Sequence, residues 1–233
     1  MTNWVARFTF QLGLAAILSG CGGGGGDSGD QSASNASFPL FAANKTRALT
    51  GSIDNFSISG SCSGTATITN APVVAASFEG TTGYAGTQTI TLSFTSCNQL
   101  SGAATGTQYF DQNYTMIGFN IPGQEYAKLA TAPTPVPEAV RVGDTAVFAT
   151  LNTYLDSTKT TPKGQRQVSY VIESDTSTTA IANLITKGYN TSGQLLYTNQ
   201  TRYRLSTDGT LSIISIDVQY STTSTLHLIF TKA

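Results

Sequence analysis

The residues best suited to chemistry lie in one short segment and at one distant histidine. Residues 60–64 read Gly-Ser-Cys-Ser-Gly, which matches the pattern of a nucleophile elbow with cysteine in the reactive position. His227, the single histidine of the chain, could serve as the base for such a nucleophile. An elbow requires a strand before it and a helix after it, whereas residues 65–69 alternate in the manner of a second strand. We therefore expect no catalytic residue here and keep a hydrolase only as a remote alternative.

His227 is expected on the outer face of a strand or at a sheet margin. It lies between Leu226 and Leu228, and alternation places it on the more polar face, with Thr225 and Ile229. A histidine base also needs a nucleophile and an orienting carboxylate, and the sequence does not locate these partners.

Metal chemistry has little support in the sequence. One histidine and two cysteines that we expect to be paired do not form a zinc ligand set of the usual spacing. Asp111-Gln112-Asn113 offers oxygen ligands, but no glutamate follows at the spacing of a calcium loop. This segment is therefore predicted to be a turn between strands, and we expect no metal and no cofactor.

Carbohydrate binding is a minor alternative within a general interaction role. The only tryptophan, Trp4, lies in the predicted leader, so stacking on a sugar would fall to tyrosines. The candidates are Tyr109, Tyr114, Tyr189, Tyr197, Tyr203 and Tyr220. We expect most of them to be sheet aromatics in cross-strand pairs.

The N-terminus carries an export and anchoring signal. Arg7 precedes a mostly apolar stretch, residues 8–18, that is too short to span about 30 Å of hydrocarbon as a helix. Leu18-Ser19-Gly20-Cys21 then resembles the lipobox of bacterial lipoproteins at all four positions. The alternatives to a lipoprotein signal are an ordinary signal peptide and an N-terminal helix. The five glycines that follow Cys21 disfavour a helix that continues past this residue.

The resemblance implies that residues 1–20 are a signal peptide and that Cys21 carries the lipid. Two or more acyl chains hold a protein stably on a membrane. Gly22 stands where an aspartate tends to retain members of the family at the inner membrane, so the outer membrane is the expected location. Residues 21–37 are small and polar and are predicted to form a flexible tether.

The charge pattern excludes one class of partner. Only 11% of the residues are charged, the formal net charge is −1, and the basic residues are scattered. Because binding to phosphates requires a basic patch, we expect no nucleic-acid partner. The expected partners are the membrane, through the lipid, and an envelope protein.

Cys62 and Cys97 are expected to form a disulfide, since an exported protein folds in a compartment that permits one. The bridge would close a loop of about 36 residues and stabilise the fold by roughly 3–4 kcal/mol. One observation argues against the pairing, because Cys97 shares the polar strand face of Thr91, Ser93 and Thr95. A bulge at a strand end could reconcile the two cysteines.

Period-two alternation recurs along the chain and predicts an all-β fold of antiparallel strands. Helical periodicity is confined to residues 125–131 and 180–187, and the second range reads equally well as a strand. We expect a β-sandwich or a meander or half-barrel in one or two β units. A Pro-rich connector at 131–140 separates an N-terminal β unit, 38–130, from a C-terminal β-meander unit, 141–233.

The chain as a whole resembles the Thr- and Ser-rich envelope lipoproteins of Gram-negative bacteria. The similarity comprises the Gly-rich tether, the segment 60–66, the second cysteine and the closing meander, and it implies no activity. We expect a non-enzymatic structural or interaction module. The alternative is a carrier of a small apolar or lipid ligand, which would require a concave apolar pocket of several hundred Å³.

Overall fold

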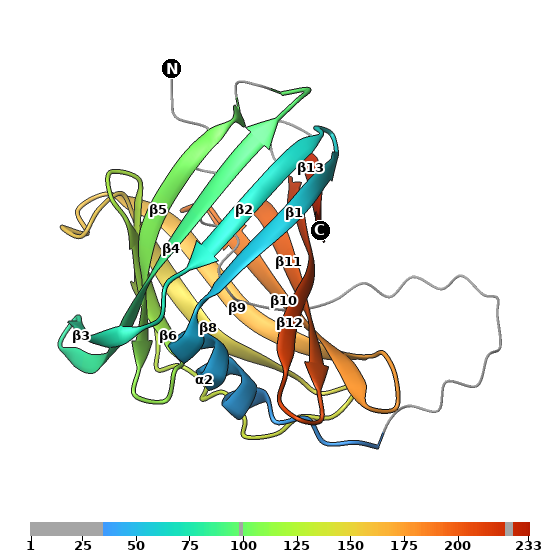
Figure 1. Ribbon diagram of the computed structural model, residues 1–233. Coiled ribbons are helices and arrows are strands. Elements are labelled where there is room, and N and C mark those ends of the chain that lie inside the picture. The colour runs from blue at the N-terminus through green and yellow to red at the C-terminus, as the bar shows by residue number, and fades with distance from the viewer. Residues whose placement is uncertain (1–34, 98–99, 222–225) are drawn as a thin grey trace.

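The computed structural model describes residues 35–97, 100–221 and 226–233 of the chain, and the leader, Cys21 and most of the predicted tether lie outside this part. The described part contains one helix and thirteen strands (Figure 1). In chain order these are α2 (Leu40–Thr50), β1 (Ser52–Gly60), β2 (Gly64–Asn70), β3 (Val74–Phe78), β4 (Thr81–Phe94), β5 (Gly102–Asp111), β6 (Met116–Ile121), β7 (Glu125–Leu129), β8 (Thr145–Tyr154), β9 (Pro162–Ser174), β10 (Thr179–Tyr189), β11 (Leu195–Ser206), β12 (Leu211–Tyr220) and β13 (His227–Lys232).

The strands form one closed antiparallel barrel. From β4 to β13 each strand pairs with its neighbour in the chain, and β13 then pairs with β1 and β1 with β2. Pairing of β2 with β4, in the register Ala66 to Leu92, closes the ring. Twelve strands form the barrel, and β3 extends the sheet by pairing with β4 alone. The all-β antiparallel class is confirmed, and the expected sandwich or half-barrel is wrong.

The barrel differs from the expected folds in its long-range pairing. Alternation along a strand is the same in a sandwich and in a barrel, because either fold buries one face and exposes the other. The two pairings that close the ring, β1 with β13 and β2 with β4, join strands whose partners no local pattern specifies. Closure leaves these strands without the unpaired edge that an open sheet would expose.

Both halves of the chain contribute to the same sheet. Strands on either side of the Pro-rich connector pair directly, β7 with β8 and β1 with β13. The connector runs beside the barrel, where the Thr134 N–H donates to the Phe148 carbonyl at 2.7 Å. Its end forms a bridge between Val140 and Phe38, just before α2.

The inward face of the barrel is apolar and the outward face is largely hydroxylic. The largest fully buried side chains are Phe38, Phe56, Phe230, Ile90, Leu92, Leu151, Ile172, Leu205, Ile216, Leu228 and Val140. On the outer face, hydroxyls from neighbouring strands contact one another, as Thr89 and Thr105 do at 2.9 Å. Threonine suits this position because its β-branch packs on the pleated sheet.

The observed helix, α2, does not coincide with either of the two helices considered from the sequence. Residues 125–131 were one of the two helix candidates, but 125–129 form the strand β7. Residues 180–187 lie within β10 and confirm the strand interpretation. The observed helix, α2, buries only Leu40 and Ala43 and has no side-chain N-cap, so its sequence carries a weak helical signal. No helix within the described ranges is long and apolar enough to cross a membrane.

Candidate functional site

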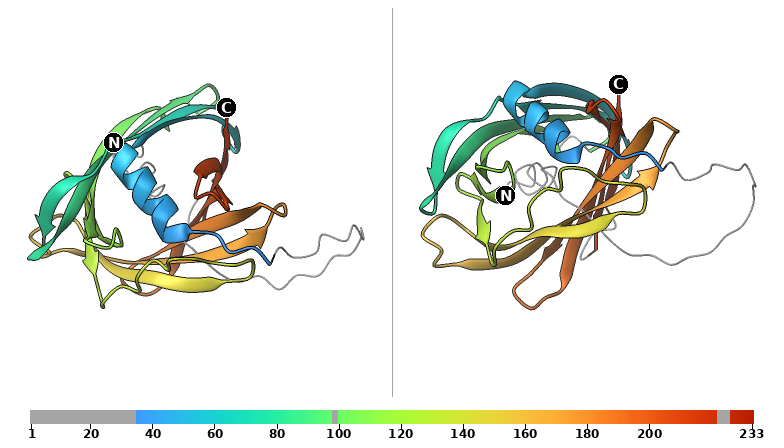
Figure 2. Two further views of the ribbon diagram at one scale, coloured as in Figure 1. Left: turned by 60° about the horizontal axis from the view of Figure 1, so that its bottom comes forward. Right: turned by 90° about the horizontal axis from the view of Figure 1, so that it is seen from below.

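α2 lies across the opening at one end of the barrel (Figure 2). Phe38, which precedes it, has no exposed surface, and its N–H and C=O exchange hydrogen bonds with Val140 at 2.8 and 2.9 Å. Leu40 and Ala43 point into the barrel mouth, while the last turn places Arg47 over the ends of β1 and β13. The helix is thus attached to the wall at both of its ends.

Asp54, on the inner face of β1, organises the charges beneath α2. Its carboxylate accepts hydrogen bonds from Arg47 Nη2 at 2.8 Å and from Lys232 Nζ at 2.7 Å. Burial alone would raise the pKa of Asp54, but the hydrogen bonds from Lys232 and Arg47 outweigh it and hold the pKa below its usual value. The Arg47 guanidinium also lies 5.2 Å from the centre of the Tyr203 ring, in cation–π geometry.

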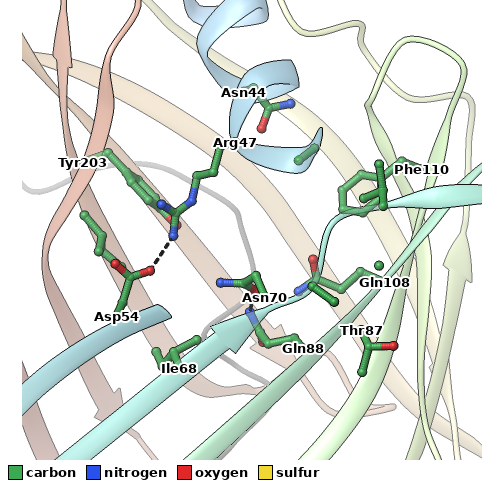
Figure 3. Close-up of a pocket in the computed structure, with 15 residues that line it drawn as sticks. Asn44, Arg47, Asp54, Ile68, Asn70, Thr87, Gln88, Gln108, Phe110 and Tyr203 are labelled. Atoms are coloured by element: carbon green, nitrogen blue, oxygen red, sulfur yellow. Dashed lines mark hydrogen bonds and ion pairs between the residues drawn. The ribbon is translucent and has the colours of Figure 1, made fainter. Parts of the chain in front are cut away.

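A cavity of about 70 Å³ lies beside this ion pair, between α2 and the strands β1, β2, β4 and β5 (Figure 3). Its wall carries a chain of polar side chains. Gln88 Nε2 donates to Asn70 Oδ1 at 2.7 Å, and Asn70 Nδ2 donates to Ser52 Oγ at 3.0 Å. Gln88 is only 5% exposed, yet its carbonyl oxygen Oε1 has no partner. Gln108, from β5, lines the same wall.

A second cavity, of about 30 Å³, lies beneath the first half of α2 and has an almost wholly apolar lining. Met116, Phe148 and Leu184 contribute to it, and Asn44 and Tyr203 line both cavities. The two small spaces therefore lie next to each other beneath the same face of the helix.

The opposite end of the barrel contains a second buried ion cluster. Glu125, at the start of β7, contacts Arg166 of β9 at 2.9 Å and Lys163 at 3.2 Å. The Arg166 guanidinium is stacked 4.4 Å from the centre of the Phe119 ring. Burial would raise the pKa of Glu125, but the charges of Arg166 and Lys163 lower it below its ordinary value. This cluster joins three strands across the interior.

A third cluster lies on the outer face, where the β3–β4 turn folds against the wall. Phe78 stacks on Tyr109 with ring centres 4.2 Å apart. Glu79 accepts a hydrogen bond from the Tyr126 hydroxyl at 2.5 Å and contacts Lys159 Nζ at 2.8 Å. Hydrogen bonds from Lys159, then Tyr126, then Lys128 lower the pKa of Glu79 to about 2.

Cys62 and Cys97 form the expected disulfide, with Cα atoms 5.8 Å apart. Cys97 lies beyond the end of β4 at Phe94, so the alternation that placed it on a polar face no longer applies. The bridge joins the β1–β2 turn to the β4–β5 connection, at the end of the barrel away from α2.

The remaining candidate residues lie in turns and on the outer face of the barrel. Residues 60–64 turn from β1 into β2 instead of leading into a helix, and the sulfur of Cys62 is bonded to Cys97. His227 lies on the outer face, where Nε2 contacts Asp217 Oδ1 at 2.9 Å, and its backbone N–H donates to Ser61 Oγ. Asp111 accepts backbone hydrogen bonds within the turn between β5 and β6, as expected.

Two of the tyrosines proposed for stacking on a sugar lie on neighbouring strands. Tyr197 and Tyr220 are cross-strand partners with ring centres 6.0 Å apart, which confirms the expected pairing for these two. Among the described residues, no group of three histidine, cysteine, aspartate or glutamate side chains is placed to hold a metal ion.

Sequence reasoning missed the residues of the cavity wall, although a signal for them was present. Asp54 and Gln88 occupy inward positions in alternating strands whose other inward residues are apolar, as Arg166 does in β9. A polar residue that interrupts an apolar face is costly unless it is paired, so such interruptions indicate buried polar sites.

No family model, curated protein or solved structure matches the chain.

Proposed function

We propose that this chain is a membrane-anchored envelope lipoprotein that acts without catalysis, as a structural or interaction module. Leu18-Ser19-Gly20-Cys21 and the Gly-rich segment after it support the anchor. The predicted tether ends at residue 37, directly before α2, so the lipid would place the α2 end of the barrel towards the membrane. The outer membrane is the proposed location, and an envelope protein is the proposed partner.

The observation that carries the interaction role is the small size of the cavities beneath α2. Among the described residues, the two cavities at this end of the barrel measure about 70 and 30 Å³. Ligand pockets of carriers typically measure about 300–1,000 Å³. Cavities of this size suit contacts at the barrel mouth and outer surface better than the enclosure of a lipid chain.

A carrier of an apolar ligand is a second candidate, and one feature of α2 favours it. Both cavities lie beneath the helix, which buries only two of its own side chains, Leu40 and Ala43, so its displacement would open both spaces. The variant Phe38→Ala should loosen α2, and a fluorescent fatty acid serves as the probe. Stronger binding of the fatty acid by the variant than by the wild type would favour the carrier. Equally weak binding by both proteins would favour the interaction module.

Metabolic labelling with a palmitate analogue tests the anchor. We expect the wild-type protein to be labelled and to sediment with membranes, and the Cys21→Ala variant to lose both properties. The double variant Cys62→Ser/Cys97→Ser is the matched control, since it removes the other two cysteines and should retain the label. Labelling of Cys21→Ala at the wild-type level would refute the lipoprotein proposal.

A further inference from the structure

Three exposed apolar side chains lie at the end of the barrel that carries α2. Among the described residues, five large apolar side chains are exposed, and three of them are Leu49, Ile53 and Val74, at 45, 69 and 66% exposure. Leu49 belongs to the last turn of α2, while Ile53 and Val74 lie within the first two residues of β1 and β3. These three side chains are called the rim patch below.

The segments that carry the rim patch adjoin one another in the fold. The Val73 N–H donates to the Ala48 carbonyl at 2.9 Å, which joins the last turn of α2 to the start of β3. A Cβ atom at Gly51 would lie 2.9 Å from the ring of Pro72, so the link from α2 to β1 packs against the link from β2 to β3. Figure 1 shows the end of α2 beside these two links. Scattered apolar side chains are ordinary on a protein surface, whereas a group on adjoining segments indicates a contact surface.

The same segments carry no negative charge. Residues 40–53 and 70–78 contain neither aspartate nor glutamate. Lys45 precedes Leu49 by one turn on the exposed side of α2, and its ammonium lies 5.6 Å from the centre of the Tyr114 ring. A lysine beside apolar side chains suits the surface of a bilayer, because its ammonium reaches the headgroups while its neighbours enter the acyl region.

The neighbouring turns at this end of the barrel are less suited to lipid. The β5–β6 turn, which is bound to α2 by the hydrogen bond from Asn44 Nδ2 to the Tyr114 carbonyl at 3.3 Å, contains Asp111. The β11–β12 turn contains Asp208. Because anionic headgroups repel carboxylates, a bilayer at this end is expected to contact the side that carries the rim patch.

The predicted tether identifies the occupant of this surface. Residues 21–37 join Cys21 to the segment just before α2. A Gly-rich chain of that length has an end-to-end distance of about 20–25 Å, and α2 adds about 16 Å, so the rim patch stays within reach of the membrane that holds the lipid. Three side chains would bind a bilayer weakly from solution. A tether raises the local concentration of bilayer and makes such a weak contact persist.

We propose that the rim patch seats the α2 end of the barrel on the lipid bilayer. Leu49, Ile53 and Val74 enter the boundary between headgroups and acyl chains, to a depth of about 5–10 Å, and Lys45 contacts the headgroups. The inference rests on the proposed lipid anchor and specifies which surface of the body the anchor brings to the membrane. The disulfide end of the barrel then points away from the bilayer, where an envelope protein can reach it.

Fluorescence quenching on the full, lipidated chain tests this contact. A nitrobenzoxadiazole label is attached to Ile53→Cys or to Val74→Cys, because Cys62 and Cys97 are bonded to each other and the proposed anchor occupies Cys21. The vesicles consist of phosphatidylcholine and phosphatidylglycerol, and part of the phosphatidylcholine carries a nitroxide that quenches the label at short range. We expect the emission at both positions to shift to the blue and to be quenched.

Ser59→Cys is the matched control for this measurement. Ser59 lies on the same exposed face of β1 as Ile53, about 20 Å further along the strand. A label at this position should be neither shifted nor quenched. Equal quenching at Ile53 and Ser59, or no quenching at Ile53 and Val74, would overturn the proposal.

A second set of variants shows whether the rim patch itself makes the contact, since a label can insert on its own. The label is moved to Ala42→Cys, an exposed position of α2, and all three residues of the rim patch are replaced by serine. This triple variant should lose most of the quenching. The double variant Val147→Ser/Leu155→Ser removes the other two exposed apolar side chains and should keep it. Circular dichroism establishes that each variant is folded, and unchanged quenching in the folded triple variant would refute the role of the rim patch.

Two further readings separate this inference from its alternatives and from the anchor itself. Energy transfer between donor- and acceptor-labelled copies of Val74→Cys, without quenching by the nitroxide lipid, would assign the rim patch to a second copy of the chain and overturn the proposal. Palmitate labelling of the same samples reports the anchor. Labelled protein without quenching would remove the bilayer contact and leave the anchor in place, whereas unlabelled protein would remove both.

Discussion

At the scale of single residues, the inward-facing charges are held by partners from elements distant in the chain. Asp54 of β1 receives hydrogen bonds from α2 and from the last residue of β13, and Glu125 of β7 is held by Arg166 of β9. Removing one member of such a buried group leaves the others desolvated and uncompensated, which destabilises a fold more than the pair itself stabilises it.

Replacement of Asp54 by asparagine is therefore expected to lower the free energy of unfolding by about 3 kcal/mol, because Arg47 and Lys232 lose their shared counter-ion. Urea unfolding followed by fluorescence measures the change. Glu138→Gln, on the exposed connector, serves as the control and should unfold at the wild-type urea concentration. Equal midpoints for the two variants would mean that Asp54 does not organise the α2 end.

Glu79 gives the clearest pH dependence. Its pKa is lowered from 4.5 to about 2 in the folded protein by Lys159, Tyr126 and Lys128, so it stabilises the fold above its unfolded pKa. This contribution is lost as the pH falls from about 4.5 towards 2. We expect the urea midpoint to fall over this range, and to fall less steeply in Glu79→Gln. A variant as acid-sensitive as the wild type would contradict the assignment.

The residue scale also shows what the sequence could reveal. The disulfide between Cys62 and Cys97, the turn at Asp111 and the outer position of His227 were all predictable from residue types and alternation. The roles of Asp54 and Gln88 were not, because a polar residue on an apolar face indicates burial without identifying its partners. Those partners come from α2, β2 and β13, which only the folded chain brings together.

At the scale of elements, α2 is held to the barrel by few buried contacts. Eleven residues contribute two buried side chains, and docking depends on Phe38 before the helix and on Arg47 within its last turn. The twelve strands of the barrel, in contrast, pair on both edges, and strands such as β1 and β11 bury alternate residues. The strands were thus predictable from period-two alternation, whereas a short, weakly amphipathic helix held by tertiary contacts was not.

Phe38→Ala is expected to loosen α2 selectively. The side chain is wholly buried, and its truncation should cost about 3–5 kcal/mol at the site, with the loss confined to docking of the helix. Hydrogen exchange read by mass spectrometry should show faster exchange over residues 38–50 and unchanged protection in β9 to β11. Leu49→Ala, an exposed position of the same helix, should leave exchange at the wild-type rate. Uniformly faster exchange throughout the strands of Phe38→Ala would contradict a separately docked helix.

At the scale of the whole molecule, closure was the feature that alternation could not predict. A sandwich, a half-barrel and a closed barrel give the same local pattern, and the choice among them is made by pairings between strands far apart in the chain. The disulfide acts at this scale, since it ties the β1–β2 turn to the β4–β5 connection beside the closing β2–β4 seam.

Reduction of the disulfide should therefore destabilise the barrel without unfolding it outright. Cys62 and Cys97 are 35 positions apart, and for a loop of that length the cross-link stabilises the folded state by roughly 3–4 kcal/mol. Denaturant unfolding with and without reductant gives the difference. The double variant Cys62→Ala/Cys97→Ala should match the reduced protein and show no response to reductant. Identical stabilities of the oxidised and reduced protein would show that the bridge does not support the seam.

Closure of the ring creates the barrel interior and the two small cavities beneath α2, and pairing of β2 with β4 completes that closure. Nuclear Overhauser contacts between backbone protons of the two strands measure it. A closed barrel predicts cross-strand contacts throughout the register from Thr65 opposite Ser93 to Asn70 opposite Gln88. If both strands instead behave as free edges, with rapidly exchanging amides and no contacts between them, the sheet is open and the interior described above does not exist.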